Sequence, residues 1–355
     1  MRSFRRPFWI LVIAFAVPAA AAPQAAAQAR EPFTIEDYFK VVTARVEDWT
    51  RDGRWLALSL SAAGDRIPQD NERSGDPAYV APSVADLVVM DAASAKPVRV
   101  FPGKTQYRSA SWSPDGRKLA LFVLQKSGYE LRIWDRAAAR FDKAAFASGK
   151  PIASNSPLIW SEAGDKIYLH LRATDWEEKT REAFRNVTQA PVMVFDSEKP
   201  FLPWDEVSRR SRLVIPALWD AASGSVAELL PETAVLSARL TRDGLFLAFE
   251  RDATEKTSYD TIGGTRNQLE ALPLSGGETR VLLKPYEQRS FSWTRDNRRF
   301  AYADKGDIFV MGLEGDDAIR VESSIVPVFA DGEGQLPAQP VAPTGVTLPD
   351  LTGGF

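Results

Sequence analysis

Five stretches of the chain repeat one arrangement of apolar and polar positions. Each begins with a large apolar residue, reaches a turn pair such as Asp-Gly three residues later, and closes on an apolar–small–apolar triplet such as Leu119-Ala120-Leu121. The triplet alternates with period two, so its large residues share one face of a strand and its small residue lies on the other. Each stretch is therefore predicted to form a strand, a tight turn and a second strand. The five stretches are residues 46–58, 110–121, 158–169, 238–249 and 290–302.

The polar residues of each repeat predict where it turns. Asp52, Asp115, Asp243 and Asp296 occupy the same position, and Ala163 stands there in the third repeat. The following residue is Gly or Asn, which tolerate positive φ, and the Asp side chain bonds its own backbone. The small residue of the triplet is Ala in four of the five repeats. We expect that alanine to let a neighbouring sheet approach closely.

Further apolar strands follow most of the repeats, for example at 87–91 and 131–135, each ahead of a turn and another strand. Four short antiparallel strands per unit, repeated radially, make a β-propeller. The sequence therefore predicts an all-β propeller built from four-stranded antiparallel blades. The alternative is a β-sandwich, which does not explain repeated turns in one register.

The spacing of the turns bounds the number of blades and the domain. The distance is 63 residues from Asp52 to Asp115, 128 from Asp115 to Asp243, and 53 from Asp243 to Asp296. For a propeller domain at 30–321, these distances indicate five or six visible blades. The same number would be visible in an incomplete seven-bladed ring. The long interval predicts an insertion at about 171–212, with a short helix over 175–185. Residues 322–355 hold five Pro, five Gly and no Lys or Arg, which is typical of a disordered or truncated tail.

The N-terminus has the pattern of a targeting segment. Three arginines, at positions 2, 5 and 6, precede an uninterrupted apolar run at 8–17, and Ala27-Gln28-Ala29 offers small residues for cleavage. Residues 1–29 are therefore predicted to be a cleaved signal peptide, and the protein to be exported, either periplasmic or secreted. The alternative is a membrane anchor, but the apolar run is shorter than the roughly 20 residues that span a bilayer. No stable membrane span is expected after cleavage.

Composition excludes several kinds of chemistry. The 355 residues include no Cys and one His, so disulfides, thiolate metal sites and cysteine nucleophiles are ruled out, and a histidine-based triad would need His170. No Gly is followed two positions later by Ser, so the G-x-S-x-G nucleophile elbow is absent. We expect no catalytic residue, cofactor or metal in this chain. Loss of the signal peptide takes the net charge from −3 to −6, which disfavours a nucleic-acid partner.

The repeats resemble those of TolB-like proteins and of the prolyl oligopeptidase (S9) family of serine peptidases. Residues 33–38, Phe-Thr-Ile-Glu-Asp-Tyr, are similar to the T-x-E-D lead-in that opens exported bacterial S9 peptidases, and the resemblance covers about 32–321. It implies a propeller that caps an α/β-hydrolase domain and admits short peptides to a serine nucleophile. That domain is missing here, so the chain alone is expected to be inert and to partner the hydrolase domain or another protein. The alternative, from TolB-like proteins, is a non-catalytic periplasmic interaction scaffold.

One acidic motif offers a candidate binding site. Dipeptidyl peptidases of the S9 family hold the α-amino group of a substrate with an acidic pair on a propeller insertion that begins Asp-Trp. The resemblance assigns this role to Glu177 and Glu178 after Asp175-Trp176, although two residues that normally separate the Trp from the acids are missing. The alternative is that Asp175 is an N-cap and the acids complement the helix dipole. His170 is expected to be a polar residue at a strand end, and residues 209–212 a solvated basic loop.

Overall fold

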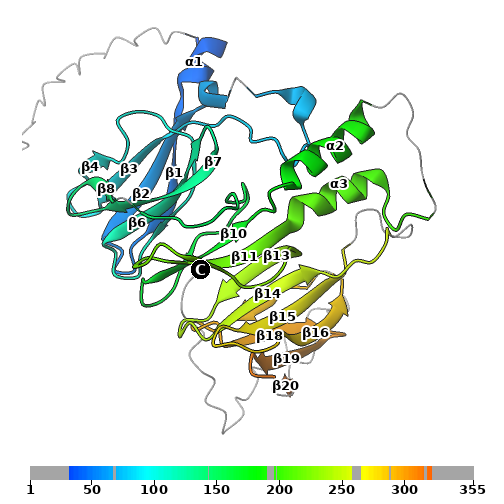
Figure 1. Cartoon of the computed structure of the whole chain (residues 1–355). Helices are drawn as coiled ribbons and strands as arrows, with labels where there is room; N and C mark the ends of the chain where they lie inside the picture. The colour runs from blue at the N-terminus through cyan, green and yellow to red at the C-terminus, as the bar shows by residue number, and fades with distance from the viewer. Residues whose placement is uncertain are drawn as a thin grey trace, which may run out of the picture.

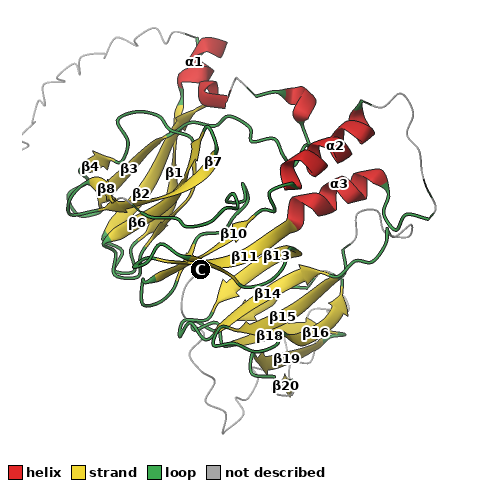
Figure 2. Cartoon of the chain, viewed as in Figure 1, coloured by secondary structure: helices red, strands yellow, loops and turns green. Residues whose placement is uncertain are grey.

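The computed structural model describes residues 32–66, 69–142, 144–189, 196, 198–257, 265–287, 289–315 and 318–321. The predicted signal peptide (1–29) and the predicted tail (322–355) lie outside these residues. In the described part the named strands pair only antiparallel and form five four-stranded blades (Figures 1 and 2). The prediction of an all-β fold made of propeller blades is confirmed. Among the described strands, no pairing joins blade 5 to blade 1.

Blades 1 and 2 follow each other directly along the chain. Blade 1 consists of β1 (Val42–Trp49), β2 (Trp55–Ala62), β3 (Asp86–Asp91) and β4 (Pro97–Arg99). A short helix, α1 (Ile35–Lys40), precedes it. Blade 2 consists of β5 (Tyr107–Trp112), β6 (Lys118–Gln125), β7 (Gly128–Asp135) and β8 (Arg140–Asp142).

Blades 3 and 4 are linked by strand pairing, because β11 and β13 bond through Leu213↔Ala234 and Val214↔Thr233. Blade 3 consists of β9 (Ile159–Trp160), β10 (Lys166–Leu171), β11 (Leu213–Asp220) and β12 (Val226–Glu228). Two helices, α2 (Trp176–Thr188) and α3 (Pro203–Arg212), lie between β10 and β11. Blade 4 consists of β13 (Thr233–Leu240), β14 (Phe246–Asp252), β15 (Asn267–Pro273) and β16 (Arg280–Tyr286). Blade 5 consists of β17 (Phe291–Trp293), β18 (Arg299–Asp304), β19 (Asp307–Gly312) and β20 (Ile319–Val321).

The first turn of every blade has the same hydrogen bonds. A Ser or Thr hydroxyl accepts the backbone N–H five residues later at 2.9–3.1 Å, and the Gly or Asn of the turn has a φ between +57° and +70°. In the third repeat, Asp165 replaces the aspartate missing at Ala163, because the hydroxyl of Ser161 donates to Asp165 at 2.6 Å. The turn is therefore retained although its usual residue has moved two positions along the chain.

The blades pack face to face with a fixed polarity. In β6, Leu119 and Leu121 pack with Ala57 of blade 1, whereas Ala120 between them packs with Ile167 of blade 3. We call the face with the two large residues the back face and the face with the small residue the forward face. This confirms that the small residue admits the next sheet. The junction of blades 4 and 5 repeats the arrangement with Ala248, Phe300 and Tyr302.

Ion pairs connect the tight turns at one rim of the blade array. The carboxylate of Glu162 in blade 3 lies 2.5 Å from the guanidinium of Arg51 in blade 1 and 3.0 Å from that of Arg242 in blade 4. Bonding to Arg51, and then to Arg242, lowers the pKa of Glu162 to about 2. A further ion pair at this rim joins blades 4 and 5, because the guanidinium of Arg298 lies 3.3 Å from the carboxylate of Asp243. The three α-helices gather at the opposite rim (Figure 1).

Candidate functional site

The insertion in blade 3 is a helical hairpin. The predicted helix is present as α2, and α2 packs against α3. The prediction of a solvated loop at 209–212 is wrong, because these residues form the last turn of α3. Arg212 pairs with Asp252 of blade 4 at 2.7 Å, and Val207 is buried. Proline at the first helical position, acids in the first turn and arginines in the last are the signals that would have indicated this helix.

A buried arginine joins the hairpin to the sheet. Arg172, which is 4% exposed, follows β10 and donates to the carbonyl oxygens of Arg210, Ser211 and Leu213 at the end of α3. Its guanidinium also donates to Asn155 at 2.9 Å and lies 3.9 Å from the centre of the Trp176 ring. A cation at a helix C-terminus complements the helix dipole and satisfies carbonyls that have no partner inside the helix. Burial lowers the pKa of Arg172 to about 10.

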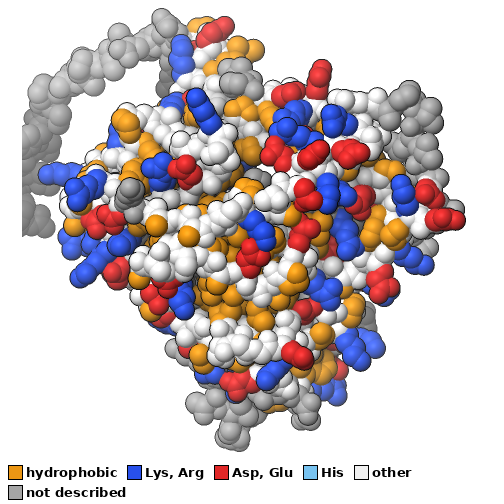
Figure 3. Space-filling model, in the orientation of Figure 1, with side chains coloured by type: hydrophobic (Ala, Val, Ile, Leu, Met, Phe, Trp, Pro, Cys, Tyr) orange, Lys and Arg blue, Asp and Glu red, His pale blue; other side chains and the backbone are white. Residues whose placement is uncertain are grey.

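A charged cleft of about 670 Å³ lies between α2 and the loop at 70–76. Figure 3 shows acidic and basic side chains side by side over this region of the molecule. Five carboxylates and three guanidiniums line the cleft, so its lining is net acidic. The carboxylates are Asp70, Glu72, Asp76, Glu177 and Glu178, and the guanidiniums are Arg73, Arg181 and Arg185.

The structure brings Glu177 and Glu178 into this cleft, in the first turn of α2. Glu177 pairs with Arg181 at 2.5 Å, whereas Glu178 forms no ion pair with any described residue. Asp175 lies at the N-cap position, but its side chain makes no capping bond and instead pairs with Lys179 at 2.6 Å, which lowers the pKa of Asp175. The acids therefore complement the helix dipole, while the capping bond that the alternative required is absent at Asp175.

The facing loop contributes a carboxylate that sequence reasoning missed. Asp76 is buried and accepts two bonds from the guanidinium of Arg73, at 2.6 and 3.0 Å. It also accepts the backbone N–H of Ala78 at 2.9 Å. Gly75 next to it lies against the ring of Phe184 on α2, so the loop is packed on the hairpin. This side of the cleft is held by bonds that leave Asp70 and Glu72 exposed.

His170 lies inside blade 3. Its imidazole is buried, and its Nε2 lies 2.8 Å from the hydroxyl of Tyr168, on the same strand. Tyr168 is the one triplet centre among the five repeats that is not Ala, and it packs towards blade 4. Burial first, and the charge of Arg172 second, lower the pKa of His170 to about 3. An imidazole that stays neutral and bonds a tyrosine inside the core has a structural role.

Replacing His170 with glutamine is expected to reduce the acid sensitivity of the fold. Unfolding returns the imidazole to a pKa near 6.5, so below that pH the unfolded chain binds a proton that the folded chain does not. The imidazole should therefore remove about 2 kcal/mol from the free energy of unfolding between pH 7 and pH 5, a loss that the His170→Gln variant lacks. Urea unfolding at several pH values measures the free energy of unfolding as a function of pH. If that free energy falls by the same amount between pH 7 and pH 5 in His170→Gln and in the unmodified protein, the prediction is contradicted.

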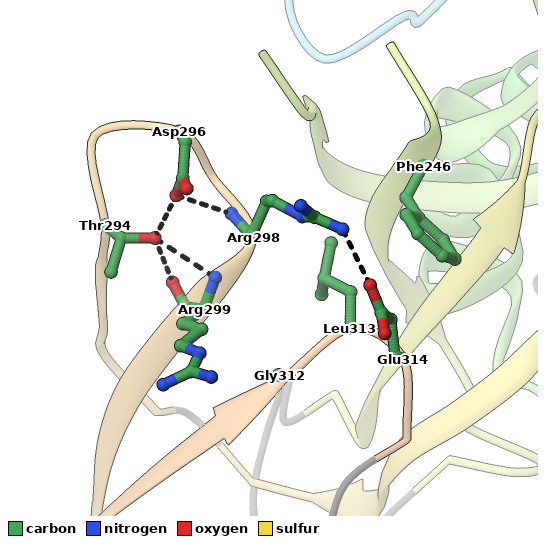
Figure 4. A pocket seen from close by; sticks show the side chains of 8 residues that line it. All are labelled: Phe246, Thr294, Asp296, Arg298, Arg299, Gly312, Leu313 and Glu314. Carbon is green, nitrogen blue, oxygen red and sulfur yellow. Dashed lines mark hydrogen bonds and ion pairs between the residues drawn. The ribbon is translucent and has the colours of Figure 1, made fainter. Parts of the chain in front are cut away.

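A second, smaller cavity of about 280 Å³ lies where blade 5 meets Phe246 of blade 4 (Figure 4). Two of its charged groups are paired with each other, Arg298 with Glu314 at 2.6 Å, and Asp296 accepts the hydroxyl of Thr294 at 2.6 Å. In the part of the chain that the structure describes, no cluster of three or more His, Asp or Glu side chains is placed to hold a metal ion. No described helix combines the length and the apolar character needed to cross a membrane.

No family model matches the chain, and no curated protein matches it. Similar solved structures include TolB from Acinetobacter baumannii, at 12% identity and a TM-score of 0.42, over 77% of this chain and 53% of that one. A prolyl endopeptidase is 13% identical with a TM-score of 0.49, over 81% of this chain and 37% of that one. The β-propeller domain of the Trilobed protease from Pyrococcus furiosus is 14% identical with a TM-score of 0.41, over 79% and 71%.

The chain thus spans about half the length of the TolB structure and little more than a third of the prolyl endopeptidase. The similar structures include both kinds of protein that the repeats resemble.

Proposed function

We propose that this chain is the non-catalytic propeller of an exported S9-type serine peptidase. In this role it gates short peptides on their way to an α/β-hydrolase domain that these residues do not contain. The observation that supports the proposal is the net acidic cleft between α2 and the loop at 70–76, built on a hairpin that Arg172 joins to blade 3.

The charges of the cleft favour a ligand with a free amino group. Arg73 is bonded to Asp76 and Arg181 to Glu177. Among the described residues this leaves three lining carboxylates without an ion pair, those of Asp70, Glu72 and Glu178, against one guanidinium, that of Arg185. A carboxylate in a partly enclosed site binds an ammonium group by charge-assisted hydrogen bonds. The volume of about 670 Å³ is in the range of small-ligand sites, which supports a short peptide as the ligand.

The double substitution Glu177→Gln/Glu178→Gln is expected to weaken binding of a dipeptide amide such as Gly-Pro-NH₂ at least tenfold, because it removes the charge that attracts the amino group. Isothermal titration calorimetry at pH 7 measures this on the chain as it stands. N-acetyl-Gly-Pro-NH₂, which has no ammonium, should bind no better to the unmodified chain than to the double variant. Glu182→Gln on α2, outside the cleft lining, is the matched control. Equal affinity for the free and acetylated peptides would contradict the proposed role.

The chain by itself is expected not to hydrolyse aminoacyl- or dipeptidyl-p-nitroanilides, because it has no G-x-S-x-G elbow. Absorbance of released nitroaniline measures this. Hydrolysis that a serine-directed phosphonate blocks would contradict the proposed lack of catalysis.

One observation favours a second candidate function, that of a protein-interaction scaffold. The helix α1 is stabilised by a capping box between Thr34 and Asp37, yet it buries none of its residues. Exposed apolar side chains gathered on one segment mark contact surfaces for other proteins. A chain that binds neither form of the dipeptide would fit this second function better. The exposed side chains are Phe33, Ile35, Tyr38 and Phe39.

A further inference from the structure

Among the residues that the structure describes, the fixed polarity of the blades leaves two opposite faces uncovered, one at each end of the array. At the four junctions inside the array, the forward face of one blade meets the back face of the next. Blade 1 has no described blade behind it, and blade 5 has none in front of it. The uncovered faces are therefore the back face of blade 1 and the forward face of blade 5.

The back face of blade 1 is large and apolar. Leu56 and Leu58 of its triplet lie on this face, and the strand register places Trp49 opposite Leu56 and Val46 opposite Leu58. Trp49 is 61% exposed and Val46 is 47% exposed. Leu56 and Leu58 are only partly buried. Their equivalents in blade 2, Leu119 and Leu121, are completely buried against the preceding blade.

The forward face of blade 5 is apolar and lined by small residues at its centre. Ala301 and Ala303 lie opposite Val310 and Ile308, and Ile319 lies opposite Val310 on the outer strand. Ile308 is 43% exposed and Ile319 is 66% exposed. The equivalent alanine of blade 4, Ala248, is buried against the aromatic back face of blade 5.

We infer that a second copy of this chain covers these faces, with the forward face of blade 5 in one copy packed against the back face of blade 1 in the other. The contact would continue the forward-to-back order found at all four junctions of the array. At three of those junctions large side chains of one blade pack over an alanine of the other, and at the junction of blades 3 and 4 Tyr168 takes the place of the alanine. Two back faces, or two forward faces, correspond to no junction in the structure. Such a head-to-tail contact is heterologous, so it forms chains of copies unless their rotation closes a ring. The inference is independent of the proposed function, since neither face contributes to the acidic cleft.

A complementation experiment tests the inference. Val46→Glu places a charge on the back face of blade 1, and Ile308→Glu places one on the forward face of blade 5. Each variant alone keeps one good face and should be monomeric in sedimentation velocity at concentrations where the unmodified protein associates. Mixed in equal amounts, the two variants should form a heterodimer of twice the monomer mass and nothing larger, since one good face remains of each kind.

Controls separate this contact from other associations. Val281→Glu replaces an equally exposed valine on β16 of blade 4 and should associate like the unmodified protein. Circular dichroism and thermal unfolding establish that every variant is folded. A monomeric unmodified protein at all concentrations, self-association of either single variant, or failure of the mixture to form the heterodimer would each overturn the inference.

Discussion

Replacing Arg172 with methionine is expected to lower the free energy of unfolding by about 3 kcal/mol or more. The guanidinium donates to three carbonyl oxygens at the end of α3 and to the side chain of Asn155. A hydrogen bond to a charged group contributes about 1.5–3 kcal/mol, and buried carbonyls left without a donor add a desolvation cost. Methionine keeps most of the apolar stem but removes the guanidinium from the face of Trp176, so the loss reports the hydrogen bonds together with the cation–π contact.

Equilibrium urea unfolding measures the effect of Arg172→Met. Arg181→Met is the matched control, because Arg181 lies on the same hairpin but is half exposed and bonds only to Glu177 one helical turn away. That control should change stability by about 0.5 kcal/mol or less. Arg172→Lys should recover only part of the loss, since an ammonium cannot reproduce the planar fork of donors. Equal losses for Arg172→Met and Arg181→Met would show that the buried bonds do not stabilise the hairpin.

Replacing Gly224 with alanine is the second large expected effect, a loss of about 2–5 kcal/mol from left-handed strain and overpacking together. Gly224 has a φ of +71°, and a Cβ there would lie 2.5 Å from the Cβ of Ala145 and 2.7 Å from its carbonyl oxygen. That oxygen also accepts a bond from the indole of Trp219 at 2.8 Å. The two segments therefore cannot separate without losing a bond in the core between blades 2 and 3.

The control for this change is Gly244→Ala. Gly244 has a φ of +70°, and no atom lies within 4 Å of the position of its Cβ. The left-handed strain is the same at both positions, about 1–2 kcal/mol, so the difference between the two variants isolates the steric clash. Urea unfolding curves of both variants measure it. If Gly224→Ala is no less stable than Gly244→Ala, the close approach of the two segments is not as the structure has it.

The blades could be predicted from sequence because their signals are local. A hydroxyl, an Asp-Gly or Asp-Asn pair and an alternating triplet lie within ten residues of one another, and each acts through its own backbone. Even so, the third repeat departs from the pattern, with Asp165 bonding the hydroxyl that an aspartate at 163 would bond in the other repeats. A helix as short and polar as α3 gives little periodic signal, since Val207 is its single buried residue.

The candidate cleft depended on contacts that no local pattern reveals. Glu177 and Glu178 stood out because they follow Asp175-Trp176, which resembles a known acidic motif. Asp70, Glu72 and Asp76 did not stand out, because they lie about a hundred residues earlier. They meet α2 because β2 and β10 both end at the same rim, which is a property of the topology. The role of Arg172 was missed for the same reason: its acceptors lie some forty residues further along the chain.

The ion pairs of Glu162 connect three blades at a single rim of the array. Because its pKa is about 2, Glu162 keeps its charge, and with it the contact between blades 1, 3 and 4, at acidic pH values where an ordinary glutamate is protonated. The cleft and all three helices lie at the other rim (Figure 1). If the curvature of the array changed while these ion pairs held, the blades would separate least at the charged rim and most at the rim of the helices. The hairpin and the loop at 70–76 lie at that rim, so such a motion would change the width of the cleft between them.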